Sequence, residues 1–170
     1  MEELSLGSGV PTETITQRWG TVESVFVDLL SDERFTVVPY PDGDEFEGVD
    51  TKTVLGSLHH RLRATLAHPE LDTIGRQSLT LALQMPAYRD MWRELSSSSA
   101  DRWSELVARA ATQGRPSNTE VPGLPVAADA AVRLVTSDCY SAVFFGDASR
   151  DAFPIVDVAE GIVTAAVTGK

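Results

Sequence analysis

Apolar residues at helical spacing constrain the fold of this chain more than any other feature of its sequence. Leu55, Leu58, Leu62 and Leu66 recur three or four residues apart, and Val54 lies next to the first of them. This spacing puts them on one face of a helix, and the proline after His68 favours an end to that helix nearby. No segment shows a convincing strand pattern. We therefore predict an all-α fold.

Similar periodicity predicts the remaining helices. In chain order they cover about 2–8, 11–19, 22–30, 51–68, 71–85, 88–112, 126–145 and 153–168. The run Ser96–Ser99 has poor helix propensity and is compatible with a break in the long helix.

Composition indicates one ordinary domain with a real core, or one domain plus a small appendage. The chain has 170 residues, of which 42% are hydrophobic, and a single cysteine, Cys139, which excludes an internal disulfide framework. No membrane-spanning run and no signal peptide are evident. We expect a soluble, cytoplasmic protein.

Charge divides the chain into an acidic leader and a balanced body. Residues 1–50 hold 12 acidic residues against two basic ones, so they carry −10 of the total net charge of −11. Residues 41–50 combine proline, glycine and acids, and we interpret them as a solvated acidic linker. Counted from Asp42, a calcium loop would need glycine where Glu47 stands and glutamate where Thr53 stands. A calcium site is therefore not predicted.

The segment "SGVPTETITQRWGTVESVFVDLL", residues 8–30, has the sequence pattern of a helix-turn-helix motif. A short helix, a turn at Gly9 and a second helix with Thr12, Glu13 and Thr14 in its first turn match the motif whose second helix enters the major groove of DNA.

This segment resembles the recognition segment of the tetracycline-repressor (TetR) family of transcriptional regulators. The matching positions are Gly9, Val10, Thr14, Ile15, Trp19, Thr21, Glu23 and Val25. "RWSELVARAATQGR" (102–115) is similar to the long helix of the family's sensing domain, which implies that Ser96–Ser99 lie inside one helix. The resemblance implies a DNA-binding part at 1–40 and a helical ligand-binding and dimerisation domain at 51–170.

Four departures from the family pattern weaken the expected contact with DNA phosphates. The family's first helix has no counterpart ahead of the motif, so the helix-turn-helix is truncated. Pro11 replaces a capping serine, Thr16 an aromatic residue and Val22 a lysine. Because cationic side chains supply much of DNA affinity, a dimeric small-molecule-binding or interaction module without competent DNA binding stays open as the alternative.

The resemblance implies a regulator that binds operator DNA, as a repressor, and whose DNA contacts fall on the motif. Thr12, Glu13 and Gln17 are expected nearest the bases, and Thr14, Thr16, Arg18 and Thr21 nearer the backbone. Glu13 could accept a hydrogen bond from a cytosine amine, or it could simply favour the positive end of the helix dipole.

The last two helices are apolar over more than half of their circumference, which indicates partners on both sides. Either residues 51–125 cover them, or they form a homodimer through a four-helix bundle with their symmetry mates. We predict the homodimer.

The family's sensing domain encloses a mostly apolar effector, and such a pocket needs aromatic walls with a few polar groups. The candidates are His59, Tyr88, Trp92, Trp103, Cys139 and Tyr140. Asp138, Cys139 and Tyr140 are compatible with either a pocket or a hydrogen-bonded core. Adjacent His59 and His60 point about 100° apart, so no metal, cofactor or enzymatic activity is predicted.

Overall fold

The structure is a computed structural model, and it describes residues 1–22, 24, 25, 28, 41, 43–66, 84, 86–116, 120–145 and 154–169. Within these residues the backbone forms six α-helices and one 3₁₀ helix, and it forms no strand. The predicted all-α class is confirmed for this part of the chain. The predicted helix at 71–85 and most of the one at 22–30 lie outside the described residues.

Two short helices open the chain. Helix α1 (Glu2–Ser8) ends at Gly9, which adopts the left-handed conformation with φ 70°, and α2 (Thr12–Trp19) ends at Gly20. A positive φ costs glycine little because it has no Cβ, so Gly9 permits the tight turn between the helices. Pro11 is the N-cap of α2 rather than a residue of its first turn. The predicted boundary was therefore wrong by one residue.

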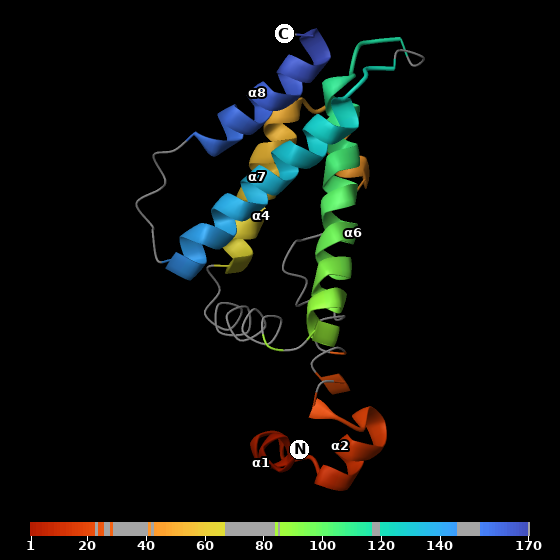
Figure 1. The fold of residues 1–170 in the computed structure, drawn as a ribbon, viewed down its shortest axis with the longest axis vertical. Helices are drawn as coiled ribbons and strands as arrows, with labels where there is room; N and C mark the ends of the chain where they lie inside the picture. Colours follow the sequence, from red (N-terminus) through yellow and green to blue (C-terminus); the bar gives the residue numbers. More distant parts are fainter. Residues whose placement is uncertain are drawn as a thin grey trace.

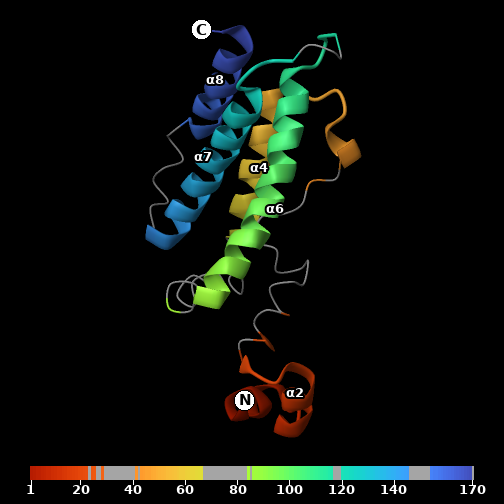
Figure 2. The ribbon, with the colours of Figure 1, turned by 45° about the vertical axis from the view of Figure 1, so that its right-hand side comes forward.

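Four longer helices form a bundle: α4 (Thr51–Leu66), α6 (Pro86–Ala111), α7 (Leu124–Phe145) and α8 (Ile155–Thr168). Helix α7 packs against α4, α6 and α8, and α4 also contacts α6 and α8. Figures 1 and 2 show this bundle, with α1 and α2 beyond the N-terminal end of α6.

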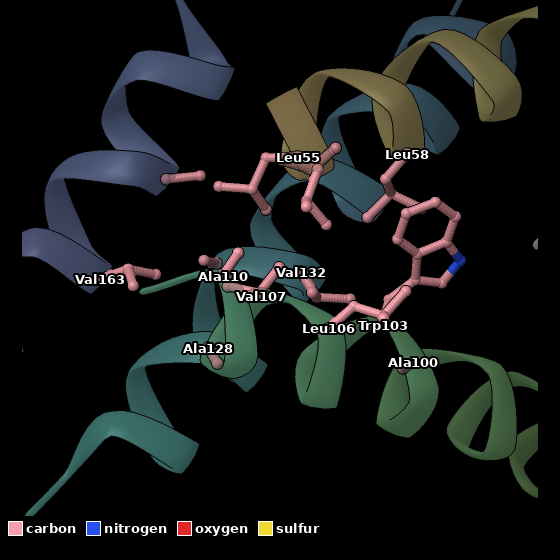
Figure 3. Close-up of a cluster of buried hydrophobic side chains, with 14 of the residues drawn as sticks. Leu55, Leu58, Ala100, Trp103, Leu106, Val107, Ala110, Ala128, Val132 and Val163 are labelled. Atoms are coloured by element: carbon pink, nitrogen blue, oxygen red, sulfur yellow. The ribbon is translucent and has the colours of Figure 1, made fainter. Parts of the chain in front are cut away.

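One hydrophobic core fills the bundle. The predicted stripe of α4 is buried in full, since Val54, Leu55, Leu58 and Leu62 are 0% exposed and Leu66 is 4% exposed. Figure 3 shows the Trp103 side chain extending from α6 toward Leu58, with Val107 and Val132 beside it. Helical periodicity therefore predicted the buried face of α4 correctly.

Helix α6 runs without interruption from Pro86 to Ala111. A break at Ser96–Ser99 is therefore wrong, and the continuous helix that the resemblance implied is correct. Ser99 is 1% exposed and Ala100 is 9% exposed, so tertiary packing on this face outweighs the weak helix propensity of serine.

The acidic linker predicted at 41–50 is also wrong as a purely solvated segment. Residues Gly43–Phe46 form the 3₁₀ helix η2, which contacts α6. Phe46 is only 6% exposed and belongs to the core cluster, and Val49 packs against that cluster. Burial of the Phe46 ring therefore anchors η2 to the core, although most other residues of the segment 41–50 are polar.

Within the described residues, no helix is long and apolar enough to cross a membrane.

Candidate functional site

Helix α2 presents most of its surface to solvent. Ile15 is its one buried residue and is 4% exposed. The predicted DNA-contacting residues lie around it: Glu13, Thr14, Thr16, Gln17, Arg18 and Thr21 are exposed, and Thr12 is half-buried. The exposed face therefore offers hydroxyls, one amide, one carboxylate and one guanidinium.

Thr21 begins the next helical segment. The backbone amide of Ser24 donates to Thr21 Oγ1 at 3.1 Å, which is the contact expected of an N-capping threonine. The backbone at 22, 24, 25 and 28 is helical. Thr21 therefore caps this helical segment, and its hydroxyl is already engaged within the chain.

Asp28 contacts two residues at the C-terminal end of α2. Its Oδ2 accepts a hydrogen bond from Trp19 Nε1 at 2.8 Å and lies 3.7 Å from Arg18 Nη2. The Arg18 guanidinium also lies 4.6 Å from the centroid of the Trp19 ring. The cation of α2 therefore has a carboxylate partner, an interaction that the spacing of the sequence did not indicate.

Among the predicted ligand residues, Trp103 and Cys139 belong to the hydrophobic core cluster, and Tyr140 packs against it. His59 and Cys139 meet across the contact of α4 with α7, where Cys139 Sγ donates to the His59 carbonyl oxygen at 3.9 Å. His59 Nε2 also lies 3.9 Å from Asp138 Oδ2, and the Asp138 side chain is 11% exposed. Tyr88 and Trp92 belong to α6, but their side chains lie outside the described part of the structure.

Cys139 and Tyr140 are groups of the packed interior. Burial, reinforced by the Asp138 carboxylate, raises the pKa of Cys139 to about 12. Burial likewise raises the pKa of Tyr140 far above its usual range. Both side chains therefore stay protonated at neutral pH, so they can serve as weak polar groups and not as anions.

Trp103 lies in a second environment, against the segment that precedes α4. Its indole meets the Phe46 ring edge to face, with the ring centroids 5.5 Å apart and 63° between the planes. The Arg61 guanidinium lies 5.6 Å from the Phe46 centroid and 5.9 Å from the Trp103 centroid. Glu45 pairs with Arg61 through both carboxylate oxygens.

Sequence reasoning missed Glu45, Phe46 and Arg61. The one available signal was an aromatic residue, Phe46, within an acidic run. Helical periodicity could not place it because its partner Trp103 lies on a different helix, far along the chain.

A surface groove of about 580 Å³ lies where the end of α6 meets the loop before α7, and none of the predicted ligand residues lines it. Its walls are Ala108, Arg109, Thr112, Glu120, Val121, Pro122, Gly123, Leu124 and Pro125. Among the described residues, no three His, Cys, Asp or Glu side chains gather as a possible metal site.

Two exposed valines mark the helices that were predicted to dimerise. Val126 of α7 is 74% exposed and Val158 of α8 is 41% exposed. One and two turns beyond Val158, Ile162 and Ala165 are half-buried. The chain by itself therefore leaves apolar surface on both helices only partly covered.

No protein-family model, curated protein or solved structure matches this chain.

Proposed function

We propose that this protein is a ligand-responsive transcriptional regulator of the tetracycline-repressor type, which binds operator DNA as a homodimer. The observation that carries the proposal is the arrangement of α1, the Gly9 turn, α2 and the helical segment capped by Thr21. This arrangement leaves the polar face of α2 exposed, as a helix that enters a major groove requires.

The side chains of α2 suit a division between bases and backbone. Thr12, Glu13 and Gln17 carry groups that read base edges, whereas Arg18 and the threonine hydroxyls suit phosphate contacts. A phosphate must first compete with Asp28 for Arg18, because these two side chains already lie 3.7 Å apart. Operator binding by this chain is therefore expected to be weak and sensitive to salt.

Dimerisation is assigned to α7 and α8. In a twofold dimer the same surface contacts its own copy, so Val158 and its neighbours on α8 would meet the equivalent residues of the partner. Burial of apolar surface that one chain leaves partly open supports this assignment. Ligand binding within the bundle would then change how well two α2 helices fit two half-sites.

A second candidate function is favoured by the state of Arg18. Its pairing with Asp28, within an N-terminal segment of net charge −10, favours a dimeric small-molecule-binding module that does not bind DNA.

Selection from a random pool of duplexes separates the two candidates. The full chain is incubated with the pool at low salt, bound duplexes are recovered and amplified, and the cycle is repeated. A regulator enriches one sequence motif, with two half-sites if it binds as a dimer. Failure to enrich any motif, by a protein that is dimeric and folded, supports the binding module and contradicts the regulator.

A further inference from the structure

Glu45 and Phe46 occupy a position on the bundle that resembles a bound small molecule. They stand at the end of η2, in the segment Glu45–Asp50, which we call the strap. Phe46 places its ring against Trp103, and the neighbouring Glu45 places its carboxylate on Arg61. A phenyl ring and a carboxylate thus meet an indole and a guanidinium supplied by two different helices.

The strap closes access to Trp103 on this side. Trp103 is 0% exposed, and Phe46, which packs against it, is 6% exposed. The polar pair is more open, since the side chains of Arg61 and Glu45 are 28% and 46% exposed. A molecule could therefore approach the ion pair from solvent, but it reaches the Trp103 ring only if Phe46 leaves.

We propose that Glu45 and Phe46 are an internal occupant of a ligand site formed by Trp103 and Arg61. The ligand class is a small acid that joins a compact aromatic ring to a carboxylate. Its ring takes the place of Phe46 against Trp103, and its carboxylate takes the place of Glu45 on Arg61. The inference rests on the proposed ligand-sensing function of the bundle and names the ligand chemistry of that function.

The ligand would replace each strap group with one of the same chemistry, a ring for the Phe46 ring and a carboxylate for the Glu45 carboxylate. An aromatic ring that meets indole edge to face regains the contact that Phe46 loses. Arginine prefers carboxylates, because its planar donors match two oxygens at once. A ring without an anion would leave Arg61 without the carboxylate it now contacts, so the charged group is a requirement and selects acids over neutral analogues.

Displacement of the strap also bears on regulation. The strap lies between the N-terminal helices and α4 in the chain, and Asp50 at its end caps α4 by accepting a hydrogen bond from the Thr53 amide at 2.8 Å. Release of Glu45 and Phe46 would free η2 from its contacts with Arg61 and Trp103, in the part of the sequence between α2 and α4. Ligand binding at Trp103 is thereby connected to the helix proposed to read DNA.

The test uses the full chain with Phe46→Ala, and hydrocinnamate as the probe. Isothermal titration compares its dissociation constant for the variant and the wild type, after circular dichroism establishes that each is folded. Because an internal competitor lowers the apparent affinity by the fraction of open molecules, we expect the variant to bind at least about tenfold more tightly. Hydrocinnamamide, the neutral analogue, is expected to bind more weakly than the acid.

Two further variants keep the test decisive. Glu45→Gln leaves the core ring in place and weakens only the hold of the strap, so it is expected to bind hydrocinnamate more tightly than the wild type. Glu47→Gln removes a neighbouring exposed acid and is expected to bind as the wild type does. If Phe46→Ala is unfolded, Glu45→Gln decides the outcome alone.

Equal affinity of the folded variants and the wild type, or equal affinity for acid and amide, overturns the proposed site. These measurements contain no DNA, so failure of the site is separable from failure of the proposed regulator. A protein that binds hydrocinnamate but selects no duplex keeps the site and loses the operator. One that selects a duplex but ignores hydrocinnamate does the reverse.

Discussion

The ring of Phe46 lies edge to face on the indole of Trp103, with 5.5 Å between their centroids. This contact joins a short 3₁₀ helix to the centre of a helical bundle. The contact anchors to the core a segment that is otherwise rich in acidic residues.

Phe46→Ala is expected to lower the free energy of unfolding by about 3 kcal/mol, because a buried phenyl ring is lost and a cavity is left beside Trp103. Urea unfolding followed by circular dichroism measures the loss. Leu6→Ala is the matched control, because Leu6 is 86% exposed, and it is expected to change stability by less than about 0.5 kcal/mol. A loss below about 1 kcal/mol for Phe46→Ala would mean that the strap contributes little to the core.

The comparison of Phe46 with α4 shows where prediction from sequence succeeds. The face of α4 is visible because five apolar residues repeat with the period of one helix, and all five are buried. Phe46 has no such repeat around it. Its burial depends on a contact with a residue on another helix, and local pattern carries no information about that contact.

The candidate sites show the same limit. The exposed face of α2 and the cap at Thr21 follow from local spacing, whereas the pairing of Arg18 with Asp28 needs the fold of the chain around Gly20. Among the predicted ligand residues, His59 and Cys139 meet across two helices. Trp103 instead faces the strap, because each helix sends successive side chains to different neighbours.

Cys139 predicts a pH dependence of stability. Its pKa is raised from 9.0 to about 12 in the folded protein, so the folded state retains a proton that the unfolded state releases above about pH 9. Stability is therefore complete below that pH and decreases as the pH rises toward 12. Urea unfolding across this range should show a steeper decrease for the wild type than for Cys139→Ala. Parallel curves would contradict the raised pKa.

Val158→Asp is expected to convert the proposed homodimer to a monomer. Val158 is 41% exposed on α8, and twofold symmetry would bring two buried, unpaired carboxylates to one interface. Sedimentation velocity measures the change of mass. Leu6→Asp adds the same charge at an exposed apolar position outside the bundle and should leave the dimer intact. A Val158→Asp protein that stays dimeric would exclude this face of α8 from the interface.

Asp28→Asn is expected to strengthen DNA binding by releasing Arg18. The variant removes the carboxylate 3.7 Å from the Arg18 guanidinium, and its amide oxygen can still accept from Trp19 Nε1. One additional phosphate contact should make the slope of log affinity against log salt steeper by about 0.9. Glu47→Gln, the same change of net charge elsewhere, is expected to change affinity less. Equal effects of the two variants would assign the gain to net charge alone.

Fluorescence anisotropy of the full chain on labelled DNA from upstream of its own gene tests the central claim most directly. Titrations at about 50 and 200 mM salt, with a scrambled duplex of the same composition as control, separate selective from general binding. A regulator binds the upstream duplex more tightly than the scrambled one, and its affinity falls steeply at the higher salt. Absence of selective binding at both salt concentrations would contradict the account and leave a dimeric ligand-binding module.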